Sequence, residues 1–220
     1  MKILALEFSS GQRSAAVVEG RAGVAPTLLG AARQAGSEKT RPLALVEEAL
    51  RAARLEREAI DALAVGLGPG SYTGIRMAIS LAQGWQLARA VRLLGVSSVA
   101  ALAAQAQAQD ISGPVSLVID AQRNEFYLAV YELGGPVPRV VEALRLATQA
   151  EMEQRAAAGE LILGPDLQRC LPSARVLFPD AATVGALAAA RTDFGPGEQL
   201  EPVYLRETNF VKAPPPRLIL

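Results

Sequence analysis

The first stretch of the chain has the pattern of two strands joined by a polar turn. Residues 2–8 (KILALEF) are mostly apolar, residues 9–13 (SSGQR) are polar and include a glycine, and residues 14–20 (SAAVVEG) are again mostly apolar. Short apolar runs bounded by turn residues are typical of buried strands. The pattern predicts a hairpin over residues 2–19 and a third strand near residues 26–33.

A helical pattern follows this hairpin. Leu43, Val46 and Leu50 recur at intervals of three and four residues, and Pro42 stands where the first turn of a helix tolerates proline. We therefore expect an amphipathic helix over residues 42–54.

Two further apolar runs read as buried strands, and each precedes a helical pattern. The first run is residues 60–68 and ends in glycines, and the second is residues 92–96. The helix after the first run is expected over residues 75–90. The helix after the second run has a suitable N-cap in Ser97 or Ser98.

The second half of the chain repeats the opening pattern. Residues 114–132 again read as strand, polar turn and strand, and Asp120 ends the first of these strands as Glu7 ends the first strand of the chain. A third strand is expected near residues 140–147, and Thr148 begins a capping-box signature for the helix after it. The repetition predicts two related lobes in one α/β fold.

These elements divide the chain into two lobes and a tail. We assign residues 1–112 to an N-terminal lobe, residues 113–206 to a C-terminal lobe, and residues 207–220 to an extended tail that contains a proline run. Each lobe is expected to hold a mixed sheet flanked by helices.

The composition removes several classes of function. The chain has 22 basic and 22 acidic residues, so it lacks the broad positive field of a stand-alone nucleic-acid binder. It has no histidine, which excludes histidine-based acid–base catalysis and most zinc sites. Its single cysteine has no internal disulfide partner, which favours a reducing, cytoplasmic setting. No apolar run reaches the length of a membrane span, and we expect no membrane contact.

A glycine-rich stretch, VGLGPGSYTGIR at residues 65–76, is the most distinctive part of the chain. Its glycines allow a sharp turn or a close approach to a ligand, and the helix after it presents free N–H groups to an anion. It lacks the lysine of a P-loop and the spacing of a dinucleotide fingerprint. A phosphate site and a tight structural turn both remain open. The residues that a nucleotide would meet here are Gly70, Ser71, Tyr72 and Thr73.

Two carboxylates at strand ends are further candidates for chemistry. Glu7, followed by Ser9 in the polar turn, and Asp120 can hold a magnesium ion through water if they face one cleft. The alternative is the ordinary polarity of strand ends, because no general base or cationic phosphate clamp lies near them in the sequence.

The helix expected over residues 75–90 carries two apolar stripes where a surface helix needs one. The first stripe consists of Ile75, Ala78, Ile79 and Ala82, and the second of Met77, Leu81, Trp85 and Ala88. The second stripe lies either deep in the core or against another protein, and its aromatic, methionine and nearby arginines suit an interface. The predicted interface comprises Leu45, Ala49, Arg76, Met77, Leu81, Gly84, Trp85 and Ala88.

Five segments of the chain together resemble the bacterial TsaB (YeaZ) family. They are ILALEFSS, GLGPGSYTGIRMAISLAQGW, LLGVSSVAAL, VIDAQRNEFYLAVYE and PVYLR, in this order, and they span residues 3–206. The resemblance implies a two-lobed fold of the actin, sugar-kinase and Hsp70 superfamily (ASKHA), with ribonuclease-H-like topology in each lobe. It also implies a role in making threonylcarbamoyladenosine in tRNA, at the adenosine beside the anticodon.

The resemblance further implies a subunit without catalytic residues of its own. The two metal-binding histidines of the catalytic paralogue, TsaD, fall on Ser98 and Leu102 of this chain, and neither side chain replaces imidazole as a metal ligand. No metal or cofactor is therefore expected in this chain by itself. The resemblance also leads us to expect TsaD and the small ATPase TsaE as partners, with ADP or ATP at the interface with the catalytic partner. We further expect a homodimer when the chain is alone, and contact with tRNA only through the complex.

One departure from the family pattern and two alternative functions stay open. Family members usually carry aspartate where this chain has Glu7, so the resemblance does not transfer a metal contact to Glu7. An actin-fold ATPase or small-molecule kinase acting alone would use Glu7 and Asp120 for magnesium. Direct tRNA binding would use Arg51, Arg54 and Arg57, although the neutral net charge favours a solvated helix face for these arginines.

Overall fold

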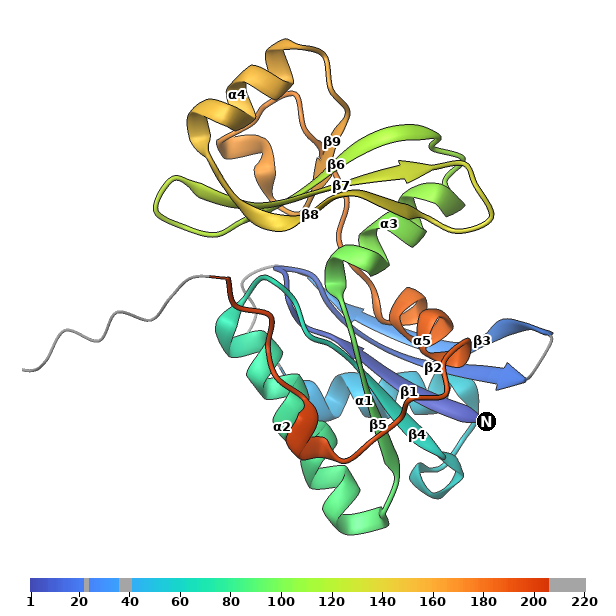
Figure 1. Cartoon of the computed structure of the whole chain (residues 1–220). Helices are drawn as coiled ribbons and strands as arrows, with labels where there is room; N and C mark the ends of the chain where they lie inside the picture. The colour runs from blue at the N-terminus through green and yellow to red at the C-terminus, as the bar shows by residue number, and fades with distance from the viewer. Residues whose placement is uncertain (22–23, 36–40, 206–220) are drawn as a thin grey trace, which may run out of the picture.

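The chain forms two lobes in a computed structural model that describes residues 1–21, 24–35 and 41–205 (Figure 1). Each lobe is built around a five-stranded sheet. The first sheet consists of β1 (Lys2–Glu7), β2 (Arg13–Arg21), β3 (Val24–Gln34), β4 (Ala62–Gly66) and β5 (Arg92–Val96). The second sheet consists of β6 (Gly113–Asp120), β7 (Glu125–Leu133), β8 (Arg139–Thr148), β9 (Ile162–Gly164) and β10 (Arg175–Val176).

The two sheets share one topology. The first is ordered β3-β2-β1-β4-β5, and the second, taken from its matching edge, is ordered β8-β7-β6-β9-β10. In each sheet three antiparallel strands joined by hairpins are extended by two parallel strands. The duplicated mixed sheet confirms the predicted α/β fold with two related, ribonuclease-H-like lobes.

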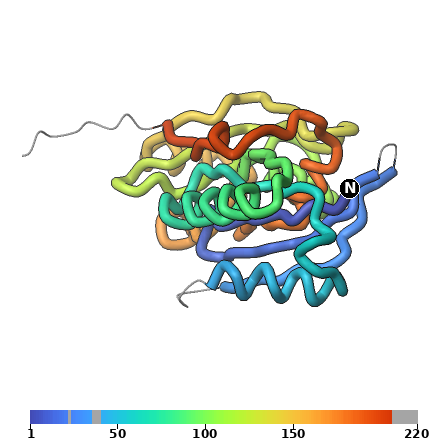
Figure 2. The backbone as a smooth tube through the Cα atoms, turned by 90° about the horizontal axis from the view of Figure 1, so that it is seen from below, coloured from blue at the N-terminus to red at the C-terminus, as the bar shows by residue number. Residues whose placement is uncertain are grey.

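Helices cover both faces of the first sheet. α1 (Pro42–Ala53) and α2 (Tyr72–Arg89) lie next to each other on one face, which Figure 2 shows from below. α5 (Ala181–Ala189) covers the opposite face. Because both faces are covered, five of the six residues of β1 are buried, in agreement with its nearly continuous apolar sequence.

The two lobes exchange helices. α3 (Ser98–Ala108) directly follows the first sheet, but its Leu102 packs beside Leu117 of the second sheet. In return α5, which follows the second sheet in the sequence, packs Val184 against Ala16 of the first sheet. Each lobe therefore contains a helix from the other half of the sequence.

A single boundary at residue 112 does not describe these lobes. The sequence-based division assigned residues 113–206 to the second lobe, whereas the chain returns to the first lobe at α5. Gly195 then forms a β-bridge with Leu93 of β5, and the N–H of Val203 donates to the carbonyl oxygen of Leu67 at 2.9 Å. The periodicity of a helix predicts which of its faces is buried, but not which sheet that face packs against. The sequence pattern of residues 181–189 therefore did not show that α5 packs on the first sheet.

The ends of the helices largely follow the expected caps. Ser97 caps α3, and Thr148 caps α4 (Gln149–Ala157) by accepting a hydrogen bond from the N–H of Glu151. α2 begins three residues earlier than predicted, because the side chain of Ser71 accepts from the N–H of Gly74 and starts the helix at the glycine loop.

Residues 201–205 have no regular secondary structure, although they stay attached to the first lobe. The predicted tail, residues 207–220, lies outside the described residues.

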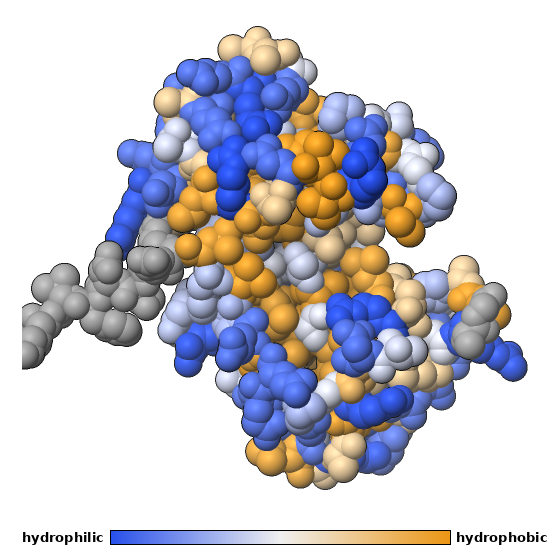
Figure 3. Space-filling view, viewed as in Figure 1, coloured by the Kyte–Doolittle hydropathy of each residue, from blue (hydrophilic) through white to orange (hydrophobic). Residues whose placement is uncertain are grey.

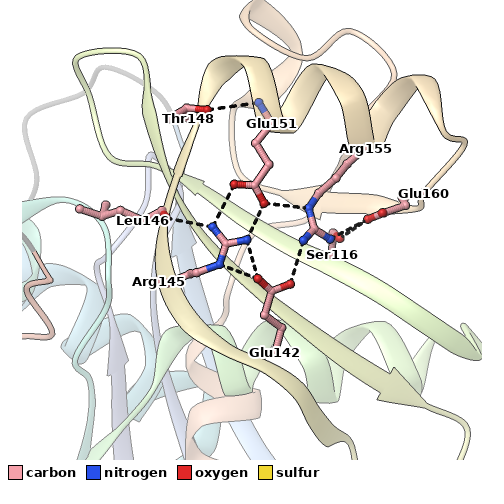
Figure 4. A network of polar contacts seen from close by, with 8 residues as sticks. All are labelled: Ser116, Glu142, Arg145, Leu146, Thr148, Glu151, Arg155 and Glu160. Atoms are coloured by element: carbon pink, nitrogen blue, oxygen red, sulfur yellow. Dashed lines mark hydrogen bonds and ion pairs between the residues drawn. The ribbon is translucent and has the colours of Figure 1, made fainter.

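A network of ion pairs ties α4 to the edge strand of the second sheet (Figure 4). Arg145 on β8 and Arg155 on α4 both contact Glu142 and Glu151, and Arg155 also contacts Glu160 at 3.0 Å. The hydrogen bonds from Arg145 hold the pKa of Glu151 below its usual value. The side chains are only partly exposed, so the network stabilises the outer part of this lobe more than isolated surface pairs do.

Apolar side chains gather at the junction of the two lobes in the space-filling view, and polar side chains dominate the far end of the upper lobe (Figure 3). In the part of the chain that the structure describes, no helix has both the length and the apolar character needed to cross a membrane.

Candidate functional site

The carboxylate of Glu7 lies in the interior of the first lobe. Its side chain is completely buried, with Oε1 accepting from the N–H of Ser9 at 2.7 Å and Oε2 accepting from Oγ of Ser98 at 2.6 Å. Burial raises the pKa of Glu7, and the hydrogen bonds from Ser9 and Ser98 only partly offset that effect. Glu7 does not line the cleft that a magnesium site shared with Asp120 required, because its carboxylate serves as an internal acceptor that joins β1 to α3.

The surroundings of Glu7 explain two neighbouring residues. A Cβ on Gly66 would lie 2.0 Å from Oε2 of Glu7, so only glycine leaves room for this carboxylate. Ser98 also bonds to the glycine loop, since its N–H donates to the carbonyl oxygen of Gly68 at 2.9 Å and its Oγ accepts from the N–H of Gly68 at 3.1 Å. Ser98 thus connects the strand end, the loop and the first turn of α3.

The glycines of the loop are required by close packing against the end of β1. A Cβ on Gly70 would lie 2.1 Å from the carbonyl oxygen of Ser9, and one on Gly74 would lie 2.0 Å from that of Phe8. The N–H of Ser71 donates to the carbonyl oxygen of Ser9 at 2.6 Å. These contacts explain why glycine stands at both positions, because the loop makes a tight structural turn against β1. A phosphate ligand at the loop stays a prediction.

A cleft of about 1270 Å³ lies between the two lobes. Its walls bring together most of the residues predicted near a nucleotide, namely Ser9, Gly70, Ser71, Tyr72 and Asp120. Thr73 is exposed on α2 but does not line the cleft. The carboxylate of Asp120 accepts hydrogen bonds from the backbone and side chain of Gln122, so it also fixes its own turn.

The two walls of the cleft differ in charge. The charged residues are Arg13 and Arg76 on the first lobe, and Asp120, Arg123, Glu125 and Asp166 on the second. A cleft with both signs of charge differs from the mainly cationic clamp that stabilises a phosphoryl group. Over the described ranges of the chain, no three acidic, histidine or cysteine side chains come together as a metal site.

An aromatic stack stands at the edge of the cleft. The rings of Tyr72 and Tyr204 stack with centroids 5.4 Å apart and an interplanar angle of 27°, and the guanidinium of Arg76 lies 5.2 Å from the Tyr72 ring centroid. Burial is the main cause that raises the pKa of Tyr204. Local sequence patterns do not mark Tyr204, because they do not show that this part of the chain returns to the start of α2.

α2 presents three faces with different surroundings. The first predicted stripe, Ile75, Ala78, Ile79 and Ala82, is buried against the sheet. From the second stripe Met77, Leu81 and Trp85 are half-buried and pack against the same apolar cluster, to which α1 contributes. The structure thus supports the core explanation for most of this stripe, and only its edges reach the surface.

The outer face of α2 is open and apolar in its C-terminal half. Gly84 has no atom within 4 Å of where a Cβ would stand, and Ala88 and Arg76 are exposed. Leu87 is 90% exposed, which makes it the most exposed of the large apolar side chains in the described residues. Leu87 lies three residues after Gly84 and therefore on the same side of the helix. Helical spacing could have placed Leu87 in the predicted interface, but the two predicted stripes did not include it.

Two residues of the predicted interface belong to the core instead. Leu45 is 4% exposed and Ala49 is fully buried, because this side of α1 faces the sheet and α2. They have no surface for a partner. Leu43, which helical spacing placed on the apolar face with Val46 and Leu50, is instead 60% exposed and is the large apolar side chain that α1 presents to solvent.

Comparison with known proteins identifies the family. A family model described as TsaD, tRNA N6-adenosine threonylcarbamoyltransferase, matches residues 9–194. The tRNA threonylcarbamoyladenosine biosynthesis protein TsaB of Escherichia coli K12 is 31% identical over 183 residues, which cover 76% of this chain and 79% of that protein. The chain belongs to the TsaB (YeaZ) family. The TsaB protein of Bacillus subtilis is 29% identical, over 59% of this chain and 57% of its own length.

A solved structure agrees with the TsaB assignment over nearly the whole molecule. The YeaZ protein of Pseudomonas aeruginosa matches with a TM-score of 0.74 and 28% identity, covering 93% of this chain and 99% of that one. The resemblance to the TsaB family drawn from the sequence motifs is therefore confirmed. In this TsaB-family chain, Ser98 and Leu102 stand where the resemblance places the histidines of the transferase, and both are used internally, one by Glu7 and the other by the core.

Proposed function

We propose that this TsaB-family chain is a non-catalytic accessory subunit of the complex that makes threonylcarbamoyladenosine in tRNA, and that it docks on a TsaD-type catalytic paralogue through the outer face of α2. The observation that carries the proposal is the exposed apolar character of that face at Leu87 and Gly84. An exposed large apolar side chain beside an open glycine lets a facing helix approach closely and bury the leucine. The names of the E. coli and B. subtilis relatives support a role in the biosynthesis of threonylcarbamoyladenosine in tRNA. The match to the transferase model supports a catalytic partner that is a paralogue of this chain.

The internal contacts of Ser98 and Leu102 support a role without catalysis. Ser98 is committed to Glu7, and Leu102 is fully buried beneath the second sheet. A metal centre there would need new ligands and the loss of core packing. The contribution of the chain is then a coupling free energy, in which docking favours the active conformation of the partner.

The wider complex is part of the same proposal. It includes the small ATPase TsaE, a homodimer through the α2 face when the partner is absent, ADP or ATP held between this chain and its partner, and tRNA bound by the whole complex in the cytoplasm. The neutral net charge of the chain agrees with RNA contact that depends on the other subunits.

The alternative of a stand-alone ATPase or kinase loses support from the position of Glu7. That alternative needed Glu7 and Asp120 to share a magnesium ion, but Glu7 is completely buried and bonded to Ser9 and Ser98. Of these two carboxylates, only that of Asp120 belongs to a residue that lines the cleft.

The docking claim is tested by placing one charge on the outer face of α2. Leu87→Glu is preferable to changes at half-buried Leu81 or Trp85, because a residue that is 90% exposed can be replaced without disturbing the core. Val137→Glu is the matched control, since Val137 is 71% exposed and lies on the second lobe. We expect Leu87→Glu to weaken binding to the purified catalytic paralogue at least about tenfold in a calorimetric titration, with Val137→Glu unchanged. Equal binding by both variants would refute the docking face.

A further inference from the structure

The C-terminal segment, residues 195–205, runs along α2 with little secondary structure of its own (Figure 1). Only Gly197–Gln199 form a short 3-10 turn. A segment without its own ladder of hydrogen bonds is held by the surfaces that it touches. Four kinds of contact with the first lobe hold this segment.

The first contact is with the edge of the sheet. β5 is an edge strand, and on its open side Leu93 exchanges two main-chain hydrogen bonds with Gly195. The N–H of Gly195 donates to the carbonyl oxygen of Leu93 at 2.8 Å, and the N–H of Leu93 donates to that of Gly195 at 3.1 Å. Addition of a strand to an open edge is a common way in which domains bind extended peptides.

The second contact is a clamp of two glutamines on α2. The side-chain oxygen of Gln86 accepts from the N–H of Gly197 at 2.8 Å, and the side-chain nitrogen of Gln83 donates to its carbonyl oxygen at 3.0 Å. A Cβ on Gly197 would lie 3.0 Å from atoms of Gln83, Gln86 and Leu93. The clamp therefore satisfies both main-chain groups of one residue and favours glycine at that position.

The remaining contacts are an apolar anchor and an aromatic one. Leu200 is 8% exposed and belongs to the apolar cluster of the first lobe. The N–H of Val203 donates to the carbonyl oxygen of Leu67, and Tyr204 stacks on Tyr72. Tyr204 remains 41% exposed, so the segment ends on the wall of the cleft between the lobes.

We propose that the surface formed by the open edge of β5 and the Gln83 and Gln86 flank of α2 is a peptide-binding site, and that the chain covers it with its own residues 195–205 as a detachable ligand. The ligand class is an extended peptide with glycine, leucine and tyrosine at the spacing of Gly197, Leu200 and Tyr204. Main-chain pairing at an edge together with separate pockets for side chains is the arrangement of peptide-recognition domains. Release of the segment uncovers the Gln83 and Gln86 flank of α2 and removes Tyr204 and Leu205 from the lining of the cleft. The proposal does not depend on the identity of the docking partner.

Hydrogen exchange on the unaltered full-length chain is the first test. If the segment detaches as a unit, the amides of Gly195, Gly197 and Val203 exchange through one shared local opening, with protection well below that of the amides in β1 and β4. Tyr204→Ala, which leaves the core intact because Tyr204 is partly exposed, should lower the protection of all three together. Protection equal to that of β1, unchanged by Tyr204→Ala, would show an integral part of the fold and overturn the proposal.

Binding in trans is the second test. A labelled synthetic peptide with the sequence of residues 193–205 is titrated into full-length wild type, the Tyr204→Ala chain, and a chain with Gln83→Ala and Gln86→Ala added to Tyr204→Ala. Weakening the segment in cis should raise the affinity for the added peptide at least about fivefold, because less competition remains. The two glutamine changes should cancel this gain. A peptide with leucine in place of the glycine at position 197 should bind no better than background, and equal affinity in all arms would overturn the proposal.

Discussion

Oγ of Ser98 donates a 2.6 Å hydrogen bond to Oε2 of Glu7, and this contact joins the end of the first strand to the helix that crosses into the second lobe. Both residues are completely buried. In this TsaB-family chain a position that the resemblance links to metal binding is thus part of the structural connection between the lobes.

The first prediction concerns that bond. Ser98→Ala should lower the free energy of unfolding by about 1–3 kcal/mol, because it leaves a buried carboxylate with one donor fewer. Urea denaturation followed by circular dichroism measures this, with Ser80→Ala on the exposed face of α2 as the control. The control should change stability by less than about 0.5 kcal/mol. A Ser98→Ala effect no larger than the control would contradict the assigned role.

The second prediction concerns the pH dependence of stability. Burial raises the pKa of Glu7 above its unfolded value of 4.5, so the folded protein binds this proton more tightly than the unfolded chain does. The resulting stability is complete below the unfolded pKa and is lost as the pH rises through the folded pKa. Glu7→Gln removes this titration, so the variant should gain stability relative to wild type as the pH is raised above 4.5. Urea midpoints across that range measure the difference, and a difference that is constant or of opposite slope would be inconsistent with a raised pKa.

The third prediction separates folding from docking at two glycines of one helix. Gly84→Ala should raise the free energy of unfolding by about 0.5–1 kcal/mol, because alanine favours the helix and its Cβ meets no atom within 4 Å. The same change should weaken binding to the catalytic paralogue, because the added methyl group stands where a facing helix approaches. Gly74→Ala is the matched comparison and should destabilise, since its Cβ would lie 2.0 Å from the carbonyl oxygen of Phe8. Thermal melts and titrations of both variants check this, and stronger binding by Gly84→Ala would count against a close helix contact.

The fourth prediction concerns the ion-pair network of the second lobe. Arg155→Ala should lower the free energy of unfolding by about 1–2 kcal/mol, after allowance for solvent screening. Arg155 contacts three carboxylates, and its side chain is only 20% exposed. Arg57→Ala breaks a pair with Glu47 whose side chains are 53% and 50% exposed, and should cost less than about 0.5 kcal/mol. Chemical denaturation compares the two. Equal costs would mean that the network acts like isolated surface pairs.

The contribution of the network to stability should also depend on pH in the acid range. Arg145 lowers the pKa of Glu151 below its unfolded value of 4.5, so the contribution of Glu151 is present above that pH and is lost as the pH falls through the folded pKa. The stability difference between wild type and Glu151→Gln should therefore shrink in acid, which urea midpoints below 4.5 would show. A difference that persists in acid would mean that the charge of Glu151 contributes little.

Local patterns in the sequence were sufficient for most elements of the fold. Rules that act within a few residues account for the helix that begins at Pro42 and for the caps at Ser97 and Thr148. They also account for the two hairpins whose first strands end at Glu7 and Asp120. The family motifs likewise pointed to the correct family, because they lie in segments that span nearly the whole chain.

Relations between distant segments were not predictable in the same way. Helical spacing showed that Val46 and Leu81 lie on apolar faces, but not that α1 and α2 bury these faces against each other and the sheet. A place at the end of a strand suited Glu7 to a cleft, whereas the structure buries its carboxylate against Ser9 and Ser98. Tyr204 reaches Tyr72 because the chain returns to the first lobe, and no local rule encodes that return.

The rate of threonylcarbamoyl transfer to tRNA by the purified catalytic paralogue, measured with and without this chain, tests the central claim most directly. The account predicts that the wild-type chain and Val137→Glu raise the rate equally, that Leu87→Glu raises it at least about tenfold less at the same concentration, and that the chain alone transfers nothing. A paralogue that is fully active alone, or an equal stimulation by Leu87→Glu, would contradict it.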